Sequence, residues 1–161
     1  MRVDWRLVTE ELLEAVLRHP GLRSVDLSLT DLSTVEPHLP ARLLHRLEEV
    51  DMWSSELTRQ QLEAILTAAE SSSTLRKLNL GNNKLSLVEP WLLARAVNRL
   101  EEVDIRHTLL TKEQVEAILS QSLVKTSLKR LVLGRVSGGV EQDLVVRAQH
   151  GIKEIILFYV T

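Results

Sequence analysis

The clearest repeating pattern of apolar and polar positions lies between Leu75 and Leu85, where the chain reads LRKLNLGNNKL. Leu78 and Leu80 are two residues apart, so a short strand would point both side chains into a core. Asn83 follows where the chain turns, and its side-chain amide can hydrogen-bond the backbone of stacked turns. Such a unit cannot bury its apolar edge alone, and the pattern therefore predicts similar units beside it.

The same pattern starts six times, at intervals that alternate between 25 and 28 residues before a last interval of 24. Its first apolar positions are Leu22, Leu47, Leu75, Leu100, Leu128 and Ile152. The segment RLEEVD at residues 46–51 recurs unchanged at residues 99–104, so the true period is a pair of unlike repeats, 53 residues long. A period of this kind is typical of proteins built from stacked repeats.

Two kinds of helix start are expected between the strands. In the longer repeats a threonine precedes an amphipathic segment, and Thr9, Thr58 and Thr111 are the predicted N-caps. In the two later copies a glutamine three residues further on completes a capping box. In the shorter repeats Pro37 and Pro90 fit the first helical turn, where no backbone donor is lost.

These elements predict a single domain in three parts: a helical cap over residues 1–21, five repeats over residues 22–151, and the terminal strand of an incomplete sixth repeat over residues 152–161. The helix of the cap is expected to bury one apolar stripe, made of Leu12, Leu13, Val16 and Leu17.

Composition and charge limit the classes of function. The 161 residues are 44% hydrophobic but only 3% aromatic, so aliphatic side chains must fill the core. A net charge of -2 gives no reason to expect nucleic acid or an anionic membrane as partner. The lack of cysteine excludes disulfides, cysteine-based zinc sites and thiol nucleophiles. There is no secretory signal and no run of roughly 20 apolar residues, so a soluble, cytoplasmic protein is expected.

The repeats resemble ribonuclease-inhibitor-like leucine-rich repeats, a class that alternates two repeat types and also forms the ligand-sensing end of NOD-like receptors. The resemblance covers residues 7–160, although Val136 stands in the asparagine position of the fifth repeat. It implies an α/β fold, a right-handed leucine-rich-repeat solenoid (horseshoe) with an inner parallel β-sheet and outer helices. It also implies a protein-binding role on the concave face, as in receptors of innate immunity or scaffold proteins.

In this architecture three rows of side chains face the concave surface, because side chains alternate along a strand. The first row is Ser24, Glu49, Lys77, Glu102, Arg130 and Glu154. The middle row is Asp26, Asp51, Asn79, Asp104, Val132 and Ile156. The third row is Ser28, Trp53, Gly81, Arg106, Gly134 and Phe158.

Acidic side chains form a ladder in the first four repeats. Asp26, Asp51 and Asp104 lie in its centre, with Glu49 and Glu102 beside them. Parallel strands are about 4.8 Å apart, so these like charges repel unless something offsets them. One interpretation is a protein partner whose basic, Lys/Arg-rich segment docks on the ladder. The other is that aspartate is inherited by duplication and hydrogen-bonds its neighbours.

Trp53 is the sharpest single candidate for a contact residue. A tryptophan on an exposed strand position has the apolar area and the donor that interface anchors have. Arg106 occupies the same row two repeats on, and His107 follows it. The alternative is that Trp53 packs flat over the adjoining strand. The predicted partner-binding set also includes Lys77 and Asn79.

The last segment is a β-prone strand with no helix after it. Ile156, Phe158 and Tyr159 make it a candidate edge for association with a second copy, as a homodimer, or with a continuing solenoid. Alternatively its aromatic side chains close the core.

Catalysis finds little support in the sequence. The five histidines follow no metal-ligand spacing, and no nucleophile lies beside a plausible base. No enzyme activity, metal or cofactor is therefore expected. The predicted function is a protein–protein interaction module, with a structural fragment that self-associates through its C-terminal edge as the alternative.

Overall fold

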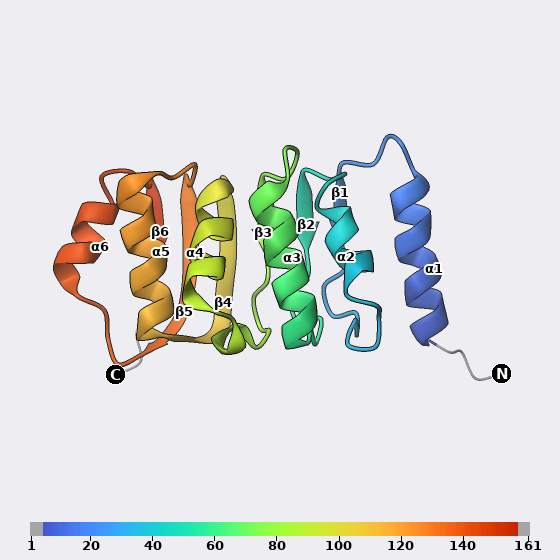
Figure 1. Ribbon diagram of the computed structural model, residues 1–161, viewed down its shortest axis with the longest axis horizontal. Helices are drawn as coiled ribbons and strands as arrows, with labels where there is room; N and C mark the ends of the chain where they lie inside the picture. Colours follow the sequence, from blue (N-terminus) through green and yellow to red (C-terminus); the bar gives the residue numbers. More distant parts are fainter. Residues whose placement is uncertain (1–4, 158–161) are drawn as a thin grey trace.

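The computed structural model describes residues 5–157, and it consists of one parallel sheet lined on one face by helices (Figure 1). The sheet order follows the chain from β1 to β6. The strands are β1 (Ser24–Asp26), β2 (Glu49–Asp51), β3 (Lys77–Asn79), β4 (Glu102–Thr111), β5 (Arg130–Ser137) and β6 (Glu154–Ile156). The helices are α1 (Trp5–Arg18), α2 (His38–Leu43), α3 (Arg59–Ser71), the 3-10 turn η1 (Leu85–Leu87), α4 (Pro90–Arg99), α5 (Lys112–Val124) and α6 (Gln142–Ala148).

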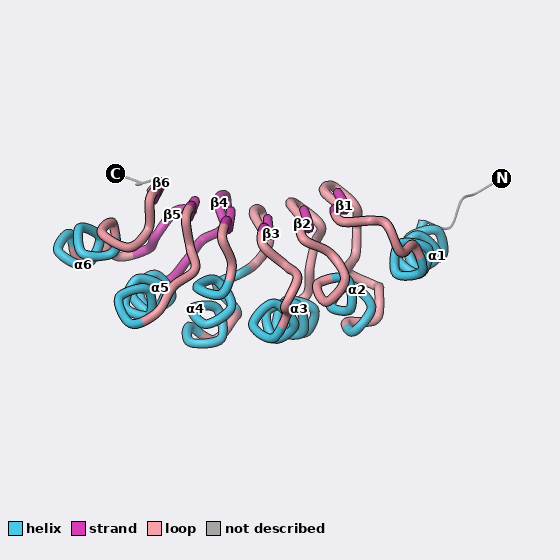
Figure 2. The backbone as a smooth tube through the Cα atoms, turned by 90° about the horizontal axis from the view of Figure 1, so that it is seen from above, coloured by secondary structure: helices cyan, strands magenta, loops and turns pink. Residues whose placement is uncertain are grey.

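Seen from above, the strands line the concave side of an arc and the helices line its convex side (Figure 2). The cross-strand partners follow the predicted intervals, because Ser24 pairs with Glu49, Glu49 with Lys77, and Lys77 with Glu102. The predicted α/β solenoid, with a parallel sheet inside and helices outside, is confirmed. Its division into cap, five repeats and terminal strand stays a prediction.

The core is almost entirely aliphatic, as the composition predicts. Leu78, Leu80 and Leu85 are each buried to 3% exposure or less. Equivalent side chains of neighbouring repeats stack on them, so each layer covers the apolar edge of the next.

Helix starts in the longer repeats agree with the prediction twice and disagree once. Thr58 and Thr111 cap α3 and α5, each in a capping box with the glutamine three residues on. Thr9 is not a cap, because α1 already begins at Trp5. Instead Thr9 lies on the buried stripe of α1, four residues before Leu13.

The buried stripe of α1 differs from the prediction in one residue. Leu13 and Leu17 are buried, and Val16 is partly buried against the core. Leu12 is 46% exposed, so its predicted burial was wrong. The inner stripe advances by four residues at each step, which turns Leu12 toward the side of the helix.

The two glutamines of the capping boxes have a second role that the sequence pattern did not indicate. The Nε2 group of Gln114 donates to the carbonyl oxygens of Leu85 and Val88, at 2.7 and 2.8 Å. Gln61 makes the same pair of bonds to the preceding short repeat. Each long-repeat helix is thereby tied to the loop of its neighbour.

The fourth and fifth repeats depart from the regular turn. After an irregularity between Ile105 and Leu109, β4 pairs with β5 again, so both strands are longer than the others. Val136 has an apolar side chain, so it cannot hydrogen-bond the backbone of the turn as the side-chain amide of Asn83 does. Gly134 lets the backbone of β5 come close to that of β4, since a Cβ at this position would lie 2.6 Å from the carbonyl oxygen of Thr108.

Candidate functional site

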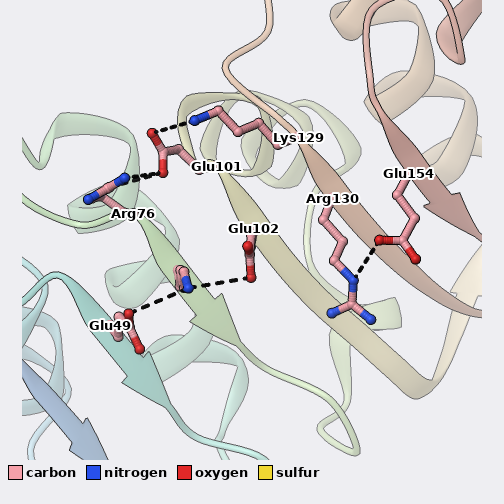
Figure 3. A network of polar contacts seen from close by, with 8 residues as sticks. Glu49, Arg76, Glu101, Glu102, Lys129, Arg130 and Glu154 are labelled. Carbon is pink, nitrogen blue, oxygen red and sulfur yellow. Dashed lines mark hydrogen bonds and ion pairs between the residues drawn. The ribbon is translucent and has the colours of Figure 1, made fainter.

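The first row of concave side chains is a chain of alternating charges. The Nζ atom of Lys77 lies 3.6 Å from a carboxylate oxygen of Glu49 and 3.8 Å from one of Glu102. Arg130 hydrogen-bonds Glu154 at 3.0 Å, as Figure 3 shows. These cations therefore offset the repulsion between the glutamates of the first row.

A second set of ion pairs runs alongside the first row. Glu101 lies between Arg76 and Lys129, at 2.8 and 3.4 Å (Figure 3). The hydrogen bond from Arg76 lowers the pKa of the Glu101 carboxyl below its usual value. These pairs link strands that are one repeat apart and are mostly exposed, so each contributes little stability by itself.

The carboxylates of the middle row hydrogen-bond the chain two residues further on. Asp26 accepts from the backbone N–H of Ser28 at 2.9 Å and from its hydroxyl. Asp51 accepts from the N–H of Trp53 at 2.9 Å. The bonds from Ser28 lower the pKa of Asp26. This geometry agrees with the second interpretation of the ladder, in which aspartate closes each turn.

Asp104 repeats this bond and adds an ion pair. Its Oδ1 atom accepts from the N–H of Arg106, and the Arg106 guanidinium binds both carboxylate oxygens, with a shortest distance of 2.7 Å. Among residues 5–157, no Lys or Arg nitrogen lies within 4.0 Å of the carboxylates of Asp26 and Asp51. The uncompensated charge of the middle row is therefore negative and lies on β1 and β2.

Trp53 is partly exposed and packs over Gly81, which follows β3. A Cβ atom at Gly81 would lie 2.7 Å from Cδ1 of Trp53 and 2.8 Å from the carbonyl oxygen of Arg106. The two interpretations of Trp53 are thus compatible, because the indole covers Gly81 and keeps an open side.

Two depressions lie on the part of the concave face that the structure describes. The first has a volume of about 330 Å³ and crosses all strands from β1 to β5 along the first and middle rows. The second, of about 350 Å³, is lined by Ser28, Asp51, Trp53, Asn79, Arg106 and His107. The structure thus brings Trp53, Arg106 and His107 together. Asp51 and Asn79 line both depressions.

The predicted C-terminal edge lies partly outside the described residues. Phe158 and Tyr159 are beyond residue 157. Ile156 is partly exposed on β6, which is the last strand of the sheet. Val132, which the row pattern places on the surface, is only 1% exposed and is therefore no surface contact.

Sequence reasoning missed three contacts of the site. The bridging position of Lys77 could have been read from the alternating charges of the first row once the register was known. The pair of Asp104 and Arg106 could have been read from their spacing of two, which puts both on one face of a strand. The role of Gly81 beneath Trp53 needed the three-dimensional packing.

The described residues contain no cluster of three or more His, Asp or Glu side chains placed to hold a metal ion. Nor does any helix among residues 5–157 have the length and apolar character needed to cross a membrane.

Comparisons with known proteins agree with the geometry. The Leucine Rich Repeat family model matches residues 74–95. The tropomodulin C-terminal domain of Caenorhabditis elegans is similar in structure, with a TM-score of 0.65 and 19% identity over 89% of this chain and 91% of that one. The leucine-rich repeat-containing protein LegL7 of Legionella pneumophila has a TM-score of 0.50 and 18% identity over 87% of this chain and 48% of its own. Among curated proteins, none matches this sequence. The repeat pattern, the family match and the structural neighbours identify the fold as a leucine-rich-repeat α/β solenoid.

Proposed function

We propose that the protein is a non-enzymatic binding module that engages a protein partner on the concave face of its sheet. One observation supports this above the others. Two adjoining depressions with charged, polar and aromatic linings cross the concave face, whereas the helices cover only the opposite face (Figure 2). Such a surface offers many separate contacts to an extended protein segment.

The side chains at the centre of this face suit a protein interface. Trp and Arg are enriched among the residues that contribute most binding energy, and Trp53 and Arg106 line the same depression. The uncompensated carboxylates of Asp26 and Asp51 favour a partner with a basic segment.

We further propose the ribonuclease-inhibitor-like class of repeat. With it we infer a recognition role in a NOD-like-receptor-type or scaffold protein of innate immunity, in the cytoplasm. The support for this class is the alternation of long and short intervals in the register of the strands.

Capture of partners from a cell extract tests the concave face. Trp53→Ala and Asp51→Lys are each expected to lose the partners that the wild type captures, with an unchanged circular dichroism spectrum. Arg59→Ala is the control, because Arg59 lies on α3 on the convex side and its ion pair is with Glu63 in its own helix. If both concave variants retain every partner, binding does not use this face.

A second candidate function is self-association through β6. The supporting observation is that, among residues 5–157, β6 pairs with β5 alone, while Ile155, Ile156 and Leu157 are partly exposed. We expect concentration-dependent dimers in sedimentation, which Ile156→Lys weakens. Val146→Lys is the control, because Val146 is exposed on α6. A strict monomer at high concentration would exclude this candidate.

A further inference from the structure

We propose that the concave face binds an arginine side chain of its partner at the β1–β2 end, against Asp26, Asp51 and the indole of Trp53. This inference rests on the proposed binding function and specifies the chemistry and place of the central contact.

Charge complementarity supports a cation at this place. The cations of the three concave rows, Lys77, Arg106 and Arg130, each already have a carboxylate within 4.0 Å. Asp26 and Asp51 have no such partner among the described residues, and they are direct neighbours in the register of β1 and β2. Two like charges at the spacing of parallel strands repel, and a bound cation would remove that repulsion.

The carboxylates are already oriented before a ligand arrives. In each, Oδ1 accepts the N–H of the residue two positions on, which is Ser28 for Asp26 and Trp53 for Asp51. The second oxygen, Oδ2, of each carboxylate accepts no hydrogen bond within residues 5–157. Little ordering is therefore needed for these oxygens to accept bonds from a partner.

The indole of Trp53 distinguishes arginine from lysine. A guanidinium is planar and stacks on an aromatic face while its forked N–H groups bond carboxylates, whereas an ammonium is a compact, strongly hydrated charge. Gly81 leaves room for the indole to lie against the turn that follows β3, and the depression beside it measures about 350 Å³. The one arginine already lining that depression, Arg106, is bonded to Asp104, so its charge is compensated.

The test is an NMR titration of the full 161-residue chain with N-acetyl-arginine amide. The backbone amide signals of Ser28 and Trp53 report binding at Asp26 and Asp51 directly, because these N–H groups donate to the two carboxylates. We expect arginine to shift these amides and the indole N–H of Trp53. N-acetyl-citrulline amide, which has nearly the same shape without the charge, should leave them in place. N-acetyl-lysine amide should bind at least about threefold more weakly.

Variants locate the arginine site on the protein. Asp51→Asn should weaken arginine binding about tenfold, since it removes a charge-assisted hydrogen bond. Asp31→Asn is the matched control, because Asp31 bonds the N–H and hydroxyl of Ser33 as Asp26 bonds Ser28, but lies after β1. The Asp31→Asn variant should bind N-acetyl-arginine amide as tightly as the wild type does.

Equal shifts with arginine and citrulline, or wild-type affinity in Asp51→Asn, would overturn the proposal. Equal binding of lysine would overturn the guanidinium assignment. If arginine fails to bind while Trp53→Ala still loses the protein partners, the inference is wrong and the proposed function stands.

Discussion

At the scale of single residues, the position after the third row has a left-handed backbone in each of the first four repeats. Leu29, Ser54, Asn82 and His107 follow the third row and have φ angles of 61°, 53°, 53° and 57°. Asparagine adopts this conformation readily, whereas leucine is strained in it by roughly 1–2 kcal/mol. Leu29 is also 73% exposed, so its side chain gains little from packing that could offset the strain.

Leu29→Asn is therefore expected to stabilise the protein by about 1 kcal/mol. Urea denaturation followed by circular dichroism measures the change. Leu87→Asn is the control, because Leu87 is also half-exposed but does not have a positive φ. A loss of stability in Leu29→Asn would mean that leucine is needed there for another reason.

The asparagine position of the repeat offers a graded series of hydrogen bonds. Asn83 donates to the carbonyl oxygens of Met52, Leu80 and Gly81 and accepts from the N–H of Leu57. The equivalent Ser55 hydroxyl donates chiefly to the carbonyl of Leu27, at 2.9 Å. The equivalent Thr108 hydroxyl is buried and has no hydrogen-bond partner in the described part of the chain. The contribution of these side chains to the free energy of unfolding should therefore decrease from Asn83 to Ser55 to Thr108.

Asn83→Ala should cost about 2–4 kcal/mol in the free energy of unfolding, because it leaves several buried groups unpaired. Ser55→Ala should cost about 1 kcal/mol, and Thr108→Val should change stability by no more than about 0.5 kcal/mol or increase it. Thermal and urea unfolding of the three variants give these values. A large loss in Thr108→Val would show that its hydroxyl is satisfied.

At the scale of elements, α4 begins with a charged cap. The carboxylate of Glu89 accepts from the N–H groups of Trp91 and Leu92, at 3.0 and 2.9 Å. These bonds lower the pKa of Glu89 from its ordinary value of 4.5. A lowered folded-state pKa gives a stabilisation that is present above pH 4.5 and disappears as the pH falls through the lower folded value.

Glu89→Gln is expected to lower the melting temperature at pH 7, because the neutral amide is a weaker cap. The difference from the wild type should shrink once the pH falls below the folded pKa of Glu89, where its own carboxyl is protonated. Glu11→Gln on α1 serves as the control, because the Glu11 side chain is exposed and makes no hydrogen bond or ion pair among residues 5–157. A difference that is the same at all pH values would contradict a role for the charge.

At the scale of the whole molecule, stability should vary with position along the solenoid. A layer in the middle has two neighbours, whereas the layers at the ends have one on the side of the sheet. The N–H groups of Leu27, Met52 and Leu80 make equivalent bonds to the next strand. Their residues are also equally buried, so they differ only in their place along the stack.

Hydrogen exchange measured by NMR should therefore be slower for the amides of Met52 and Leu80 than for that of Leu27, by about tenfold or more. The reason is that opening the first layer breaks fewer contacts than opening a central one. Identical exchange at the three positions would instead mean that the solenoid unfolds only as a single unit.

The sequence alone determined the repeat intervals, the register of the strands and the rows that face the concave surface, except at Val132, which is buried. Apolar spacing achieves this because a shift of one residue would turn Leu78 away from the core. It also identified the caps at Thr58 and Thr111, where the signal is local. Thr9 shows the limit of that signal, because the same residue type can be buried inside a helix.

Only the tertiary structure decided which charges on the concave face are compensated. Lys77 pairs with residues from two other strands, and Trp53 lies on Gly81, so both contacts join residues one repeat apart. Periodicity places these residues on neighbouring repeats, whereas the direction of each side chain decides which of them come into contact. The candidate arginine site at Asp26 and Asp51 depends on that distinction between paired and unpaired charges.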